Sequence, residues 1–183
     1  MRRLSVLVLL ASLIGLAHAS RAADAPDPPS LGMTRTDFER FVEFRHASVI
    51  SEFGGIVALE SSDPDIEFER YQFTEPTTLQ PSRLWQIQLA YRMPTSRAGF
   101  IAVEKDLANR LGPPVETVSR EAEHGALPYE RRVWREANTS VTLVACPDGE
   151  TVSDEARLQV VTVERQLEQI ALAQRKKAVA QRK

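Results

Sequence analysis

RLWQIQLAYR, residues 83–92, is the stretch that decides the fold. A large apolar side chain stands at every second position: Trp85, Ile87, Leu89 and Tyr91. This period of two is typical of a β-strand with one buried face. Pro81 and Pro94 bracket the run, and proline cannot continue the hydrogen-bond ladder of a sheet. We therefore expect a central strand on which Trp85, Ile87, Leu89 and Tyr91 all face the core.

The first nineteen residues resemble a secretory signal rather than folded structure. Arg2 and Arg3 precede an apolar run at 4–16, and the small residues of Ala17-His18-Ala19 supply a cleavage site. The apolar run is too short for a membrane span, which needs about 20 residues. We expect a signal peptide at 1–19, and hence an exported protein that is periplasmic or secreted. The segment 20–33, rich in Ala, Pro and Asp, predicts a flexible leader.

Length and composition predict one α+β domain over residues 34–164, followed by a basic helical tail at 165–183. The chain has a single cysteine, Cys146, which excludes an intramolecular disulfide. Its formal net charge is −2, so a nucleic-acid partner is not expected.

Two amphipathic helices are expected. Thr36-Asp37-Phe38-Glu39 has the form of a capping box, and apolar residues at helical spacing extend from it to Gly54-Gly55, a helix-ending pair. The second helix is expected at 98–111, with Thr95 or Ser96 as its cap.

The strands are expected around the central one. Besides the 83–92 run, we expect strands at 56–59, 66–73 with a bulge near Arg70, 129–136, 140–146 and 157–164, and a loop at 115–127. The fold class is therefore α+β, with an antiparallel sheet covered on one face by the two helices. A tandem α-β-β-β repeat is the alternative, because Phe68-Glu69-Arg70 and Tyr129-Glu130-Arg131 hold equivalent places in the two halves.

Two family resemblances follow from these patterns. Leu31-Gly32-Met33-Thr34 before a helix resembles the Gly-Met-Thr opening of the small lipoproteins of outer-membrane barrel assembly, in which a helix precedes a three-stranded sheet. Those proteins attach to the membrane through a lipidated cysteine, and this chain has none at its cleavage site. A tandem helix-plus-sheet repeat is also similar to the secreted β-lactamase inhibitor proteins, a likeness of architecture that implies no function.

Candidate catalytic and metal-binding residues are few. His46 and His124 are the histidines left after signal removal, and neither belongs to a zinc ligand set. The acidic stretch 60–69 lacks the glycine and the distal glutamate of a calcium loop, and we expect Glu67 and Glu69 to face outward from a strand. No Gly-x-Ser-x-Gly elbow or phosphate loop is present. We expect no cofactor, no metal and no enzymatic activity.

The tail is the best candidate for a partner-binding segment. It combines a modest apolar stripe with basic residues, a pattern that suits a protein groove or weak contact with an anionic membrane surface. The candidate partner-binding residues are Leu167, Ile170, Arg175, Lys176 and Lys177. The preferred hypothesis is a non-enzymatic binding or accessory protein. The alternatives are a hydrolase using carboxylates of the 60–69 region or the His124 loop, and a protein held weakly at the envelope by its basic tail.

Overall fold

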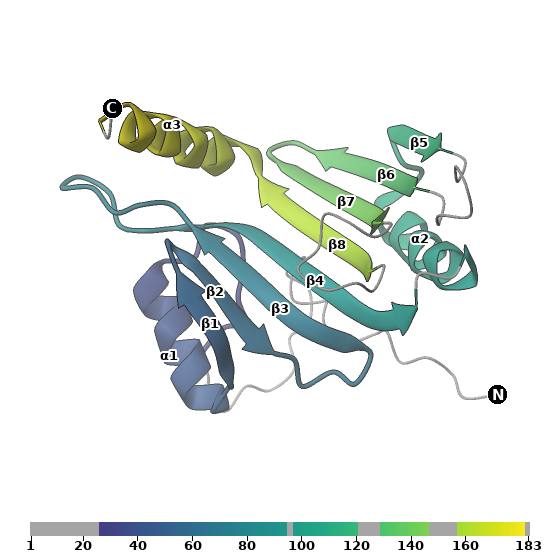
Figure 1. Ribbon diagram of the computed structural model, residues 1–183, viewed down its shortest axis with the longest axis horizontal. Helices are drawn as coiled ribbons and strands as arrows, with labels where there is room; N and C mark the ends of the chain where they lie inside the picture. Colours follow the sequence, from purple (N-terminus) through teal and green to yellow (C-terminus); the bar gives the residue numbers. More distant parts are fainter. Residues whose placement is uncertain (1–25, 95–96, 121–128, 147–156, 182–183) are drawn as a thin grey trace.

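The computed structural model describes residues 26–94, 97–120, 129–146 and 157–181 (Figure 1). These residues form three helices and one eight-stranded antiparallel sheet, which confirms the α+β class. The elements in chain order are α1 Arg35–Arg45, β1 Val49–Phe53, β2 Ile56–Glu60, β3 Ile66–Phe73, β4 Leu84–Pro94, α2 Arg97–Leu111, β5 Glu116–Arg120, β6 Tyr129–Glu136, β7 Thr139–Cys146, β8 Arg157–Glu164 and α3 Arg165–Gln181. The strands lie side by side in the order β1-β2-β3-β4-β8-β7-β6-β5, so two meanders meet where β4 pairs with β8.

The first helix is shorter than the sequence predicts. Its N-cap is Thr34, whose hydroxyl accepts from the backbone N–H of Asp37, and its C-cap is His46 in the left-handed conformation. The prediction that this helix runs on to Gly54-Gly55 is wrong. Those glycines have φ of 57° and 79° and connect β1 to β2 in a two-residue hairpin loop, where a positive φ at both positions matches the twist of the strands.

The Gly-Met-Thr segment has a defined structural role for each residue. Gly32 adopts φ of 84°, and its N–H donates to the carbonyl of Leu84 at 2.8 Å. Met33 packs against the core and its carbonyl accepts from the N–H of Leu84 at 2.9 Å. Thr34 then caps α1. The end of the predicted leader is thus hydrogen-bonded to the start of β4.

The side chains of the central strand, β4, alternate between the two faces of the sheet. Ile87, Leu89 and Tyr91 are buried and pair across to residues 158–162 of β8; we call this the inner face. Phe38 of α1 and Phe100, Val103 and Leu107 of α2 belong to the same core cluster as these residues. The alternate residues, beginning with Gln86 and Gln88 and including Val161 and Val163 of β8, form the outer face.

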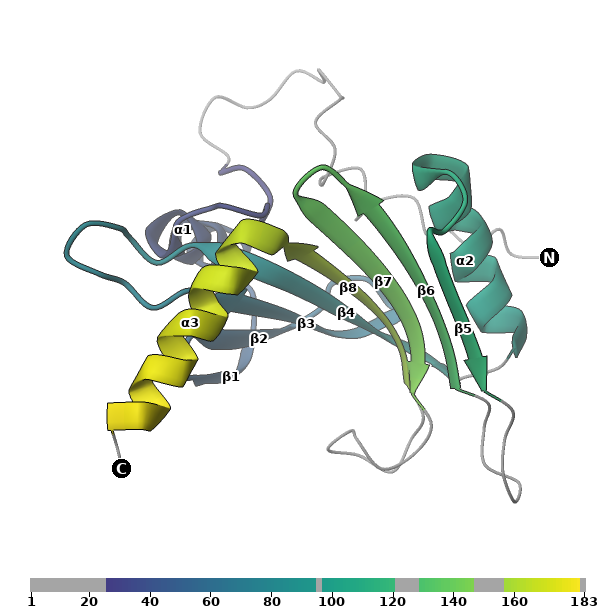
Figure 2. The ribbon, with the colours of Figure 1, turned by 90° about the horizontal axis from the view of Figure 1, so that it is seen from above.

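The prediction that Trp85 shares the inner face is wrong. Gln72 pairs with Gln86 but Phe73 pairs with Leu84, so Trp85 is an extra residue at a bulge. The bulge changes the phase of the strand: Leu84 joins the inner core, and Trp85 packs with Val163 and Ala171 in a second cluster. Helix α3 packs over Trp85 and contacts the two middle strands, β4 and β8. Figure 2 shows the helix continuing from the end of β8.

Other boundaries differ in smaller ways. The bulge expected near Arg70 lies between Ile66 and Phe68, and part of the predicted 115–127 loop is strand β5. The hairpin of β6 and β7, strand β8 and the start of α3 are confirmed. The two expected caps of the second helix, at positions 95 and 96, lie outside the described residues.

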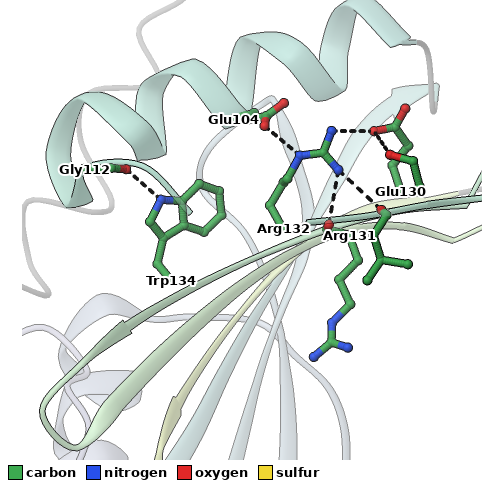
Figure 3. Close-up of polar contacts among 8 residues, drawn as sticks. Glu104, Gly112, Glu130, Arg131, Arg132 and Trp134 are labelled. Atoms are coloured by element: carbon green, nitrogen blue, oxygen red, sulfur yellow. Dashed lines mark hydrogen bonds and ion pairs between the residues drawn. The ribbon is translucent and has the colours of Figure 1, made fainter. Parts of the chain in front are cut away.

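Helix α2 is fixed to the sheet by polar contacts as well as apolar ones (Figure 3). Trp134 and Arg132 of β6 point toward α2, whereas Arg131 points to the other side of the sheet. The indole Nε1–H of Trp134 donates to the carbonyl of Gly112 at 2.9 Å, just after the helix. Arg132 pairs with Glu104 of α2 at 2.7 Å and with Glu130 at 2.8 Å.

Candidate functional site

A pocket of about 220 Å³ lies between the C-terminal end of α1, the end of β2 with the turn after it, and the middle of β3. Its walls combine apolar, hydroxyl and charged side chains, which are Phe41, Arg45, His46, Ala47, Ser48, Leu59, Glu60, Ser61, Ser62 and Glu69. Because the lining comes from three elements and the turns between them, no single motif in the sequence predicts it. We call it the Glu69 pocket.

Glu69 is the unusual residue of this pocket. It pairs with Leu59 on one side and with Leu89 on the other, so it stands on the inner face of the sheet and is only 8% exposed. The prediction that Glu69 faces outward is therefore wrong. Its carboxylate accepts from the Ser61 hydroxyl at 2.7 Å and from the Tyr71 hydroxyl. None of the ion pairs found among the described residues includes Glu69.

Tyr71 is held in its neutral form. Burial raises the pKa of its hydroxyl well above 10, and the negative charge of Glu69 and their hydrogen bond raise that pKa further. Arg45 acts in the opposite direction and lowers the pKa of Tyr71. A tyrosine hydroxyl is protonated at physiological pH, and the raised pKa of Tyr71 extends the protonated form to more alkaline pH, so the hydroxyl remains a donor to Glu69.

The cationic side of the pocket is formed by the end of α1. The Arg45 guanidinium lies 5.6 Å from the centre of the Phe41 ring, a cation–π distance. His46, which the sequence suggests is a partly buried helix residue, is exposed and caps the helix with φ of 50°. Its N–H donates to the carbonyl of Glu43 at 3.1 Å.

The predicted partner-binding residues of α3 separate into two groups. Leu167 packs against the Trp85 cluster, and Arg175 lies 5.6 Å from the Trp85 ring and donates to Gln72 at 3.1 Å. Ile170, Lys176 and Lys177 are exposed. Leu167 and Arg175 therefore stabilise the docked helix, while the other three remain accessible. Partner binding by these residues stays a prediction.

Deleting α3 after Gln166 is expected to expose Trp85 without unfolding the sheet. The helix covers Trp85 with Leu167 and Ala171 and fixes the loop before β4 through Gln174, which bonds the backbone of Glu75 at 3.0 and 2.9 Å. Tryptophan emission should shift to the red while the circular-dichroism signature of the strands is kept. An unchanged emission maximum would contradict the docking of α3 on Trp85.

The sheet ends in strand β1, and this edge is apolar. All five residues of β1 are exposed, and Val49, Ile50 and Phe53 are large hydrophobic residues, Phe53 at 86% exposure. An end strand has one side of its backbone without a strand neighbour. The β1 edge therefore presents both main-chain hydrogen-bonding groups and apolar side chains.

The other residues named from the sequence contribute less. His124 and the acids beside it lie outside the described residues. Asp63 and Asp65 form the turn before β3, where the N–H of Asp65 donates to the Asp63 carboxylate at 2.9 Å. Sequence reasoning missed Glu69, although a signal exists: Glu69 is in phase with Tyr71 and Phe73, both of which are buried.

The described residues contain no group of three or more His, Cys, Asp or Glu able to hold a metal ion. In the same part of the chain no helix has the length and apolar character needed to cross a membrane. No protein-family model, no curated protein and no solved structure matches this chain.

Proposed function

We propose that this chain is an exported, non-enzymatic binding or accessory protein, periplasmic or secreted, and that its partner is a protein that adds an extended segment to β1. The observation that carries the proposal is the edge strand β1, all of whose residues are exposed, among them Val49, Ile50 and Phe53. Strand addition uses main-chain hydrogen bonds for affinity and side-chain contacts for specificity. The export part of the proposal is supported by the sequence of residues 1–19, which resembles a secretory signal.

The opposite edge of the sheet, strand β5, differs from β1 because it carries a charged residue that is paired with its neighbouring strand. Glu116 of β5 pairs with Arg131 at 3.3 Å and with Arg135 at 3.2 Å. Charged side chains on an edge strand are a common protection against pairing with other chains. Strand β1 carries one acid, Glu52, which is paired with Arg35 of the same chain at 2.5 Å. Of the two edges, β1 is therefore the better suited to a partner.

We also propose two features of the architecture: an internal duplication, and helices α1 and α2 on the same face of the sheet. We infer that the two halves are a duplication of an α-β-β-β-β unit, one strand longer than the α-β-β-β unit expected from the sequence. Each half is a helix followed by a four-stranded meander, and the meanders meet in mirrored order at β4 and β8. We also infer that α1 and α2 cover the same face, because both place side chains in the larger core cluster. A duplicated scaffold has two equivalent edges, and differences between them allow one edge to acquire a partner.

A hydrolase is the second candidate. The observation in its favour is that Ser61 donates to the buried carboxylate of Glu69 in a pocket also lined by His46 and Glu60. Binding is preferred because the exposed apolar side chains of strand β1 have no role in a hydrolase at this pocket, whereas they suit a partner protein. The third candidate, weak envelope association, relies on Lys176 and Lys177 beside the exposed Leu172 and Val179 of α3.

Replacing Ile50 and Phe53 together by lysine is expected to abolish partner capture while leaving the fold intact. Both side chains are exposed, and exposed substitutions change the free energy of unfolding by about 0.5 kcal/mol or less. The measurement is affinity capture, in which the mature protein serves as bait and its partners are recovered from the envelope fraction. The matched control is Leu79→Lys, because Leu79 is a 91% exposed apolar residue of the loop before β4.

Three outcomes distinguish the alternatives. Loss of the captured protein in the Ile50/Phe53 variant and its retention in Leu79→Lys support the β1 edge. Retention in both variants, with loss on deletion after Gln166, would assign binding to α3 instead. A dimer of the purified chain that the Ile50/Phe53 variant dissociates would identify the partner as a second copy of this protein.

A further inference from the structure

We propose that the Glu69 pocket binds a primary ammonium group, with the Glu69 carboxylate as its counter-ion. This pocket is separate from the β1 edge, and its lining carries two carboxylates, Glu60 and Glu69, against one guanidinium, Arg45. Glu69 is buried between Leu59 and Leu89, where an aliphatic residue would continue the core. Buried charges in proteins are normally paired, because an unpaired charge loses its solvation without compensation.

The carboxylate has room for a further donor. Its two oxygens have about four acceptor positions, of which the hydroxyls of Ser61 and Tyr71 use two. Both donors are neutral hydroxyl groups. The cation that lines the pocket, Arg45, lies over the Phe41 ring. Arg45, whose charge also reaches Tyr71, is one cation against the two carboxylates of Glu60 and Glu69, so an incoming cation completes both the hydrogen bonding of Glu69 and the charge balance of the pocket.

The shape of the pocket selects a small ligand. At about 220 Å³ it is smaller than the 300–1,000 Å³ that is usual for pockets binding drug-sized molecules. Phe41, Ala47 and Leu59 provide apolar walls for a short alkyl chain, and Ser48 and Ser62 provide hydroxyls. These dimensions suit a chain of a few carbons that ends in a charged group.

The chemistry of the lining selects an ammonium group among charged groups. An anion would meet the carboxylates of both Glu60 and Glu69. A metal ion would need three or more ligating side chains, and the described residues provide no such group. Ammonium is a compact charge with three donors, which matches one carboxylate together with neighbouring hydroxyls. The same group is supplied by a free amine or by a lysine side chain of a protein.

The test titrates n-butylammonium, which has the four-carbon stem of lysine, into the full mature chain by NMR at neutral pH. The wild-type protein is expected to bind it saturably, and to bind n-butanol weaker by about tenfold or more. Glu69→Gln is expected to weaken n-butylammonium binding by about tenfold or more, because Gln keeps the size of the side chain and removes its charge.

If the Glu69→Gln variant does not fold, a second variant, Ser62→Lys, still tests the ammonium site. Ser62 is an exposed residue of the pocket wall, so Ser62→Lys places an ammonium of the chain itself at the pocket and should block n-butylammonium binding. Thr78→Lys, in the exposed loop before β4, is the matched control and should bind as the wild type does. Equal binding by the wild type and Ser62→Lys would overturn the proposal.

A peptide arm distinguishes the two sources of the ammonium. A lysine-containing peptide that binds more tightly than n-butylammonium, and that loses binding when its lysine is acetylated, identifies a protein lysine as the ligand. A peptide that binds no better than n-butylammonium identifies a free amine. Both results support the ammonium site. No saturable binding of n-butylammonium by the wild type at concentrations up to about 50 mM would overturn it.

Discussion

Phe38→Ala is expected to lower the free energy of unfolding by about 3–5 kcal/mol, the usual cost of truncating a fully buried aromatic residue. Phe38 is 1% exposed and is the residue that anchors α1 on the sheet. Its ring centre lies 4.7 Å from that of Tyr71 and 5.1 Å from that of Phe73, the latter in an edge-to-face arrangement. Such aromatic pairs contribute about 0.5–1.5 kcal/mol beyond the area they bury.

The matched control for Phe38→Ala is Phe44→Ala. Phe44 lies on the same helix but is 54% exposed, so its truncation should change the free energy of unfolding by about 0.5 kcal/mol or less. Urea unfolding followed by circular dichroism measures both variants. Equal losses would contradict the packing of α1 on Tyr71 and Phe73, and would remove the basis for the Glu69 pocket, which is lined by Phe41 and Arg45 of the same helix.

Much of the sheet follows from local sequence patterns. The β6–β7 hairpin was predictable because Val141, Leu143 and Ala145 alternate along β7 and a short polar turn precedes that strand. Strand β8 was predictable because its run of apolar and β-branched residues suits a strand. The 47–55 segment was not predictable in this way. Val49, Ile50 and Phe53 have the spacing of a helix face, yet they belong to a strand, because the Gly54-Gly55 turn folds it against the apolar run of β2. Tertiary pairing therefore overrides the local period.

The bulges explain the largest errors of side-chain placement. An extra residue reverses the alternation of every side chain that follows it. The bulge in β4, opposite Gln72 and Phe73, places Trp85 under α3. The bulge in β3, between Ile66 and Phe68, places Glu69 on the inner face. Neither bulge carries a glycine or proline that would reveal it in the sequence.

The candidate sites depend on contacts that no local pattern records. The Glu69 pocket is lined by the end of α1, the end of β2 and the middle of β3, which are separated in the sequence. The β1 edge depends on the strand order, because only the order shows which strand ends the sheet. The candidate residues of α3 could be found from the sequence, because the small and basic residues of this helix are close together in one continuous segment.

The two tryptophans offer a paired test of both faces of the sheet. Trp85 and Trp134 are both almost fully buried, and alanine at either position should cost about 3–5 kcal/mol of unfolding free energy. Phenylalanine at the same positions is expected to separate them. Trp134 donates its Nε1–H to Gly112, whereas the buried Nε1–H of Trp85 has no hydrogen-bond partner among the described residues.

Trp134→Phe should therefore destabilise the protein by about 1–3 kcal/mol, because it leaves the Gly112 carbonyl without its donor. Trp85→Phe removes an unsatisfied buried N–H, whose desolvation also costs about 1–3 kcal/mol, and this gain offsets the smaller ring and the weaker contact with Arg175. Its expected stability equals or exceeds that of the wild type in urea unfolding. Equal destabilisation by both phenylalanine variants would mean that the Trp85 N–H is hydrogen-bonded in solution, and that α3 docks on the sheet in a different register.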